Sequence, residues 1–181
     1  MKGPIKADLW SYWGVADAIC ITTNGSCDRN GDAIMGRGNA LEAAQRFPGL
    51  ALRLGRQLRT VGNVTQVITG TPLLLLPNAV QTQIVALPTK PGDKRVTSLD
   101  ELMLQFRNTT RVGTIAQGWK FLSPSELIIS SLVGLVDLAD TFKWENVVLP
   151  PPGAGNGGQD FNEVVEACQE LLDDRFTMVT Q

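Results

Sequence analysis

Short apolar runs recur along the chain, and several of them stop at a turn signal. The first run, Ala-Asp-Ala-Ile-Cys-Ile-Thr-Thr at residues 16–23, combines small and β-branched residues and ends at Asn24-Gly25. Such runs are typical of buried strands, because β-branched side chains pack well on a pleated surface. We therefore predict strands at residues 16–23, 64–68, 73–76, 83–87, 146–149 and 175–179.

Other segments carry apolar residues at helical spacing. One stripe starts at Ala40 and continues to Leu58, but Pro48-Gly49 interrupts it, so it predicts one helix or two short ones. Two further helices follow start signals. Ser123-Pro124-Ser125-Glu126 offers an N-cap serine with proline at the first helical position, and a capping box opens residues 160–173.

A polar stretch at residues 91–118 breaks the regular order of strands and helices. It contains one plausible helix, after the capping box Ser98-Leu99-Asp100-Glu101, and we interpret it as an insertion. Elsewhere strands alternate with helices, which is typical of an α/β sheet with helices on both faces. The length of 181 residues suits one core, so we predict a single domain over residues 1–181.

The composition excludes several classes of chemistry. The absence of histidine removes Ser-His-Asp and Cys-His catalysis and most zinc sites. Sixteen basic and 18 acidic side chains give a net charge of -2, so we expect no bulk electrostatic binding of nucleic acid. Cys20, Cys27 and Cys168 form no CxxC pair, and no apolar leader or membrane span stands out. We expect a cytoplasmic protein with no metal, no cofactor and no membrane partner.

Two glycine-rich loops, at residues 24–39 and 150–158, each follow a predicted strand and precede a predicted helix. Ligands of α/β sheets bind beyond the carboxyl ends of strands, and bare backbone N–H groups at a helix start suit a phosphate. Tight turns are the alternative, but the pairing of two such loops favours phosphate binding. Gly153, Gly155 and Gly158 also match the dinucleotide pattern G-x-G-x-x-G; a truncated dinucleotide-binding domain is a weaker interpretation, because only 23 residues follow.

These residues resemble the macro domains, a family that binds ADP-ribose. The matching stretches are residues 7–9, 16–24, 33–40, 46–49 and 149–158. They span nearly the whole chain outside the insertion, and they are most similar to the branch of macro domain antitoxins and ADP-ribosyl hydrolases. The resemblance implies a three-layer α/β/α fold with a central mixed sheet and helices on both faces. It also implies ADP-ribose, or an ADP-ribosylated macromolecule, as the partner.

The resemblance implies a role for particular residues. Asp8 would accept a hydrogen bond from the adenine amino group, the Leu9 amide would meet the ring, and Asn24 would hold the distal ribose. The two loops would enclose the diphosphate with backbone N–H groups. The implied ligand-binding residues are Asp8, Leu9, Asn24, Met35, Gly36, Arg37, Gly38, Asn39, Ala40, Gly153, Ala154, Gly155, Asn156, Gly157 and Gly158.

The catalytic groups of the related hydrolases are matched less well. Ala44-Gln45 stands where a lysine is common, and Gly157 stands where some members carry an aspartate. We therefore predict water attack, with Asn24 orienting the distal ribose and Asp32 as the general base. Asp32 has the alternative role of capping a turn. Lys90, a possible lysine nucleophile, ranks lower.

Two functions from different classes stay open. The first is a hydrolase that removes ADP-ribose from a protein or nucleic acid, or a phosphatase acting on an ADP-ribose phosphate. The second is a noncatalytic binder of ADP-ribose or a related nucleotide. We favour the hydrolase, because we expect no second module to which a binder could recruit a partner.

Overall fold

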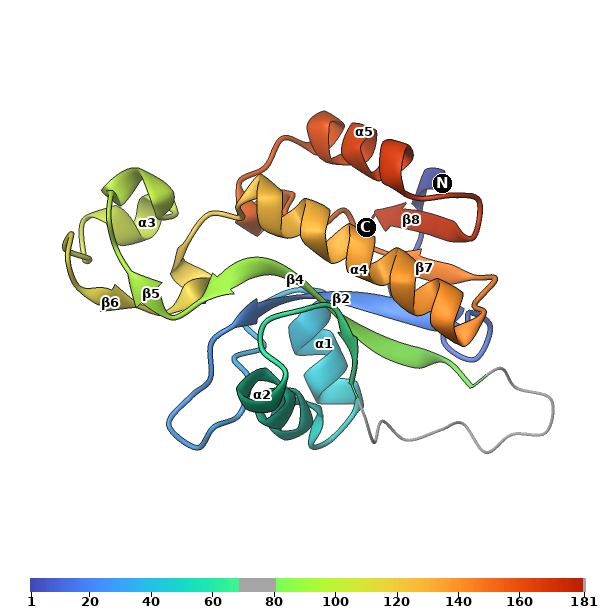
Figure 1. Cartoon of the computed structure of the whole chain (residues 1–181), viewed down its shortest axis with the longest axis horizontal. Helices are drawn as coiled ribbons and strands as arrows, with labels where there is room; N and C mark the ends of the chain where they lie inside the picture. Colours follow the sequence, from blue (N-terminus) through green and yellow to red (C-terminus); the bar gives the residue numbers. More distant parts are fainter. Residues whose placement is uncertain (69–80, 181) are drawn as a thin grey trace.

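A six-stranded mixed sheet forms the centre of the computed structural model, which describes residues 1–68 and 81–180 (Figure 1). Its strands are β1 (Lys2–Lys6), β2 (Ala18–Gly25), β3 (Gln66–Val67), β4 (Gln83–Gly92), β7 (Val147–Leu149) and β8 (Phe176–Thr180). The strand order is β1-β8-β7-β2-β4-β3. Neighbouring strands are parallel except β3, which pairs antiparallel with β4.

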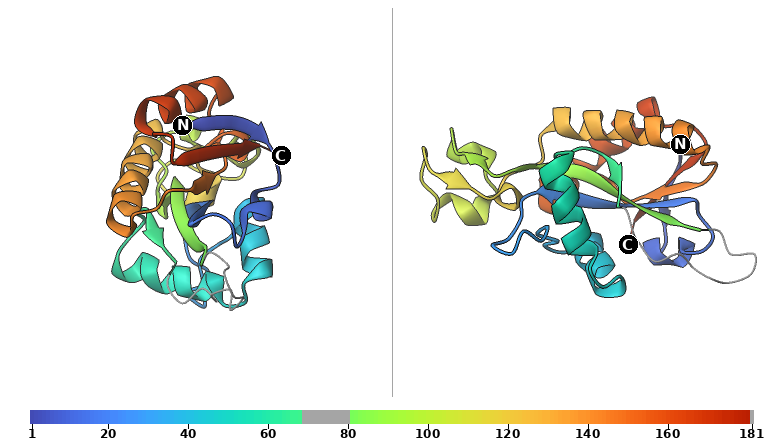
Figure 2. Two further views of the ribbon diagram at one scale, coloured as in Figure 1. Left: turned by 90° about the vertical axis from the view of Figure 1, so that its right-hand side faces the viewer. Right: turned by 60° about the horizontal axis from the view of Figure 1, so that its bottom comes forward.

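Helices cover both faces of the sheet, as the views in Figures 1 and 2 show. On one face lie α1 (Asn39–Arg46), α2 (Leu50–Thr60) and the short 3-10 helix η1 (Leu9–Tyr12). On the other face lie α4 (Ser125–Phe142) and α5 (Phe161–Leu171). The three layers expected from the sequence are therefore present.

The central strands are buried on both faces, which explains their nearly continuous apolar sequences. In β2, Ile19 and Ile21 join the core beneath α1 and α2, whereas Ala18 and Cys20 join the core beneath α4 and α5. Successive side chains of a strand point to opposite faces, so one strand supplies both cores.

The predicted α/β fold class is confirmed, with differences at the margins. The predicted strands at residues 16–23 and 83–87 become β2 and β4, which pair in parallel, and the interrupted stripe forms two helices rather than one. The apolar pattern does not predict β1, because most of its residues are exposed at the edge of the sheet. The predicted strand at residues 73–76 lies outside the described residues.

Side chains cap α5 as predicted but not α4. Asp160 accepts hydrogen bonds from two backbone N–H groups at the start of α5. At α4, Pro124 occupies the N-cap position and no side chain caps the helix, so the predicted Ser123 cap is wrong. The Ser123 backbone N–H instead donates to the Gly157 carbonyl at 2.8 Å, which ties the start of α4 to the second glycine loop.

Residues 93–121 form a small unit that projects from one end of the sheet, called the satellite module below (Figure 1). The stretch interpreted as an insertion, residues 91–118, largely overlaps it, and the capping box at Ser98 opens a 3-10 turn rather than an α-helix. Its own small core consists of Val96, Leu102, Ala116 and Phe121. Its elements are β5 (Lys94–Arg95), η2 (Leu99–Glu101), α3 (Leu104–Arg107), β6 (Ile115–Ala116) and η3 (Gly118–Lys120).

Candidate functional site

A cavity of about 880 Å³ opens at the carboxyl ends of β2, β4 and β7. Its volume lies within the range of small-molecule sites, and its position is the usual one for ligands of α/β sheets. The walls come from the loop after β2, the loop after β7, the end of β4 and the satellite module. The predicted ligand-binding residues that line it are Leu9, Asn24, Met35, Gly36, Arg37, Gly38, Asn39, Gly153, Ala154, Gly155, Asn156 and Gly157.

Three predicted ligand-binding residues do not line the cavity. Asp8 is exposed, and its carboxylate accepts a hydrogen bond from the Trp10 backbone N–H at 3.0 Å, which caps η1. Ala40 is buried in the core beneath α1. Gly158 lies against Leu122, where a side chain would have no space.

Asp32, the predicted general base, is also not brought to the cavity. It closes a turn with Asp28, whose carboxylate accepts from the Asp32 backbone N–H at 3.0 Å and whose own N–H donates to the Asp32 carbonyl at 2.8 Å. Arg59 anchors this turn to α2 by donating to the Gly31 carbonyl at 2.6 Å. Asp32 therefore lies in a turn, but the carboxylate that caps this turn belongs to Asp28 rather than to Asp32.

The first glycine loop exposes its backbone to the cavity at two positions. Gly36 and Gly38 adopt φ values of 57° and 63°, and a side chain added at either would meet no atom within 4 Å. Gly38 is also the N-cap of α1, and no side chain caps this helix. The backbone N–H groups at the start of α1 are therefore available to an anion. Arg37, between the two glycines, is exposed and lines the same cavity.

The glycines of the second loop serve two different purposes. Gly155, which begins the 3-10 turn η4 (Gly155–Gly157), has a φ of 67° and open space where a side chain would be. Gly153 and Gly157 instead lie so close to Ile128 and Ser123 that an added Cβ would collide with them. The phosphate-approach interpretation therefore applies to Gly155, whereas tight packing explains the other two.

The amide side chains at the cavity are partly engaged within the protein. Asn24, which is 8% exposed, donates from Nδ2 to the Ile34 carbonyl at 2.7 Å and accepts at Oδ1 from the Ser26 N–H at 2.9 Å. Asn39 accepts at Oδ1 from the backbone N–H and the hydroxyl of Thr22. An amide nitrogen carries two protons, so Asn24 keeps one for a ligand.

Lys90, which the sequence analysis ranked low as a nucleophile, also lines the cavity. It lies at the end of β4, paired in register with Asn24 of β2. Its Nζ donates to the Trp119 carbonyl at 3.0 Å and contacts Met103 Sδ at 2.9 Å. In residues 1–68 and 81–180 no carboxylate forms an ion pair with it. Burial lowers the pKa of its ammonium from 10.5 to about 8.

A lysine with this pKa carries a larger neutral fraction at neutral pH than an exposed lysine does. At pH 7 about one tenth of Lys90 is the neutral amine, against less than a thousandth for an ordinary lysine. Neutral lysine amines act as nucleophiles and bases, and strongly shifted groups concentrate at functional sites.

The satellite module supplies a wall of the cavity that the sequence did not predict. Met103, Gln105, Phe106 and Trp119 line it, and the rings of Phe106 and Trp119 meet edge to face at 5.0 Å. The one available signal is the aromatic residues Phe106 and Trp119 in and directly after the polar stretch, because nothing local in the sequence shows that this stretch folds back over β4.

Other chemistries find little support in the part of the chain that the structure describes. No three His, Cys, Asp or Glu side chains gather there as a metal site, and no described helix has the length and apolarity to cross a membrane. Burial raises the pKa of Cys168 to about 12 and that of Cys20 further, so neither thiol supplies a thiolate at neutral pH.

Solved structures share this architecture, although the sequence itself matches no known family. No family model and no curated protein matches the sequence. Among solved structures, the macrodomain of Mycobacterium tuberculosis DarG superposes with a TM-score of 0.67 at 21% identity, over 100% of this chain and 98% of that one. The macrodomain of Thermus aquaticus DarG superposes with a TM-score of 0.64 at 22% identity, over 98% of this chain and 95% of that one. This chain folds as a macrodomain.

The three-layer macrodomain fold with a central mixed sheet, expected from the sequence, is thus confirmed. A third similar structure is Thermosipho africanus DarTG in complex with ADP-ribose, with a TM-score of 0.58 at 16% identity. The match spans 91% of this macrodomain and 38% of that longer chain. At these identities the comparisons establish the fold, so function has to be argued from the cavity itself.

Proposed function

We propose that this macrodomain binds ADP-ribose in the cavity and removes it from a carrier, meaning the protein or nucleic acid that bears the modification. The observation that carries the proposal is the convergence of two glycine loops on one cavity. Gly36 and Gly38 on one loop and Gly155 on the other leave open space where side chains would stand. A diphosphate needs close backbone approach of this kind. The Thermosipho africanus DarTG structure, which contains ADP-ribose, supports the ligand class.

Hydrogen-bonding side chains at the end of the cavity near β4 orient the ligand. Ala7, Leu9 and Val179 line the end near β8 and offer apolar surface for the adenine ring. Asn24 lines the end near β4 and offers a hydrogen-bond donor for the hydroxyls of the distal ribose, and Lys90 lies beside it at the same end. The diphosphate then lies between the two glycine loops, beside the start of α1.

Lys90 is the catalytic group in place of Asp32, as a nucleophile rather than as a general base. In its neutral form, the amine attacks the anomeric carbon of the distal ribose, and the bond from this carbon to the carrier breaks. The carrier leaves with the electron pair and takes up a proton. The ribose ring of the Nζ adduct then opens: the anomeric carbon becomes doubly bonded to Nζ, and the ring oxygen takes up the nitrogen's proton as a hydroxyl. Water hydrolyses this imine, which frees ADP-ribose and restores the amine. Asn24 keeps the ribose in place through its remaining N–H.

Binding and turnover are tested separately. Calorimetric titration should show ADP-ribose binding more tightly than AMP, because AMP lacks the second phosphate and the distal ribose. Equal affinities would refute the two-loop site. Incubation with ADP-ribosylated protein and ADP-ribosylated DNA should release ADP-ribose, and borohydride should trap a covalent adduct on Lys90. A protein that binds ADP-ribose but releases none from either substrate is a binder, and the catalytic half of the proposal then fails.

A further inference from the structure

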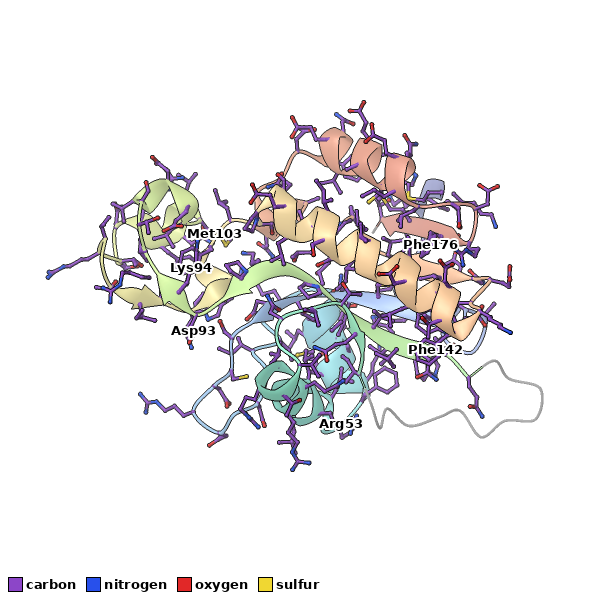
Figure 3. All side chains as sticks on the ribbon, in the orientation of Figure 1. Arg53, Asp93, Lys94, Met103, Phe142 and Phe176 are labelled. Carbon is purple, nitrogen blue, oxygen red and sulfur yellow. The ribbon has the colours of Figure 1, made fainter. Side chains whose placement is uncertain are left out.

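The satellite module is attached to the sheet through one buried hydroxyl group. Ser26, which is 1% exposed, lies just beyond the end of β2. Its Oγ donates to Asp93 Oδ1 at 2.5 Å and accepts from the Gly118 backbone N–H at 2.6 Å. Asp93 opens the module and Gly118 lies at its return to the sheet, so Ser26 joins both ends of the module to β2. Figure 3 labels Asp93 at this attachment.

The module in turn holds the head of Lys90. Both polar partners of Nζ, the Trp119 carbonyl and Met103 Sδ, belong to it. Figure 3 labels Met103 in the module. Trp119 directly follows Gly118, so its carbonyl has the position that the Ser26 hydrogen bond sets. The burial that lowers the pKa of Lys90 therefore depends on how this module is seated.

Other charged groups around Lys90 are engaged elsewhere. Asp93 bonds to Ser26, Lys94 pairs with Glu101 at 2.7 Å, and Lys120 lies over the rings of Phe106 and Trp119. The Arg37 side chain lines the same cavity from the first glycine loop. The pKa of Lys90 is lowered by burial rather than by any of these charges.

We infer that Ser26 is a positioning residue, whose hydroxyl seats the satellite module so that Trp119 and Met103 hold the Lys90 amine at the reacting end of the cavity. The inference rests on the catalytic role proposed above for Lys90. Ser26 itself does not line the cavity. It acts on the amine through Gly118 and Trp119, about 90 residues further along the chain.

The inference predicts that chemistry and ligand binding separate. Ser26 lies at the start of the first glycine loop, but the glycines that would hold the diphosphate, Gly36, Gly38 and Gly155, make none of the hydrogen bonds that Ser26 Oγ makes. Substituting the Ser26 side chain also leaves its backbone bonds to Asn24 and Ile34 in place. Loss of the hydroxyl should therefore lower kcat and leave the affinity for ADP-ribose nearly unchanged.

The test uses four variants of the whole chain. Ser26→Ala removes the hydroxyl, and Asp93→Ala removes its exposed acceptor without a change in any buried residue. Asp93→Asn keeps an acceptor oxygen and is the conservative rescue. Asp100→Ala is the matched control, because Asp100 is a module carboxylate that pairs with Arg107 and makes no bond to Ser26.

The decisive measurement is the pKa of Lys90, followed by NMR on protein with 13C-labelled lysine and assigned with Lys90→Arg. A pKa near 8 is expected in the wild type, Asp93→Asn and Asp100→Ala, and a rise toward 10.5 in Ser26→Ala and Asp93→Ala. At neutral pH this rise removes most of the neutral amine, so kcat should fall about tenfold or more at unchanged KM.

The outcomes are distinct. An unchanged Lys90 pKa in folded Ser26→Ala would overturn the positioning role, as would a loss of ADP-ribose affinity in calorimetry. If the wild-type protein turns over no substrate, the proposed hydrolase fails, but the NMR titration still decides whether Ser26 seats the module around Lys90.

Discussion

The proposed phosphate site makes its sharpest prediction at Gly155. Its backbone has a φ of 67°, and no atom lies within 4 Å of the position that a Cβ would take. Gly155→Ala therefore fits the unliganded protein without a steric clash. In the complex, the new methyl group would occupy the space through which a phosphate oxygen approaches the loop.

The expected magnitudes separate the two effects. An alanine forced into the left-handed region costs about 1–2 kcal/mol of folding free energy, which lowers Tm by about 2–8 °C in a chain of this length. Loss of one charge-assisted hydrogen bond to phosphate costs about 1.5–3 kcal/mol, or about 10- to 150-fold in Kd. The backbone strain is present with and without ligand, so it does not contribute to the change in Kd.

Gly62→Ala is the matched control, because Gly62 also has a positive φ, 97°, and open space at the Cβ position, yet does not line the cavity. Thermal unfolding should show similar losses of Tm for the two variants. Calorimetry with ADP-ribose should show a weakened Kd for Gly155→Ala alone. If both variants bind ADP-ribose as the wild type does, the second loop does not hold a phosphate and the two-loop site is wrong.

The remaining predictions concern the catalytic group and the packed part of the second loop. Lys90→Met should abolish release of ADP-ribose from a carrier while changing its Kd less than about threefold, since a methionine keeps the apolar stem; retained turnover would exclude the lysine. Asp32→Ala should leave turnover unchanged, because Asp32 does not line the cavity; a large loss would reinstate the general base. Turnover should rise with pH up to about pH 8 and level off above it, because the deprotonated amine is the active form. A turnover rate that does not change between about pH 6 and pH 9 would contradict an active amine with a pKa of about 8. Gly157→Ala should destabilise the unliganded protein by about 2 kcal/mol or more, because its Cβ would collide with Ser123; an unchanged Tm would contradict the packing argument.

A strand or helix could be predicted from the sequence wherever the segment's own residue pattern indicates it. The runs that form β2 and β4 are buried on both faces, so their apolar residues are continuous and easy to recognise. The edge strand β1 has no such signal, because Lys2 and Lys6 are exposed and its partner is β8 at the far end of the chain. Pairing over that separation depends on the whole sheet and leaves no local pattern.

The candidate site divides in the same way. The glycine loops could be predicted from the sequence, because a left-handed backbone and a close approach of the backbone to a ligand both require glycine. The burial and lowered pKa of Lys90 could not be predicted from the sequence, because Met103 and Trp119 contact its amine only after the satellite module folds back. Asp32 was misplaced for the opposite reason: a local turn with Asp28 decides its position, and the pattern of loop residues does not show which carboxylate closes that turn.

The narrow base of the satellite module has a consequence for how such proteins diverge. A Cβ on Gly118 would collide with the Pro91 carbonyl and lie 3.0 Å from the Gly92 carbonyl oxygen, so the chain leaves the sheet and returns to it at nearly one point. An excursion with touching ends tolerates changes in length, because each doubling adds only about 0.6 kcal/mol of loop-closure entropy. The wall formed by Phe106 and Trp119 can therefore change in length and composition while the sheet and both glycine loops stay as they are.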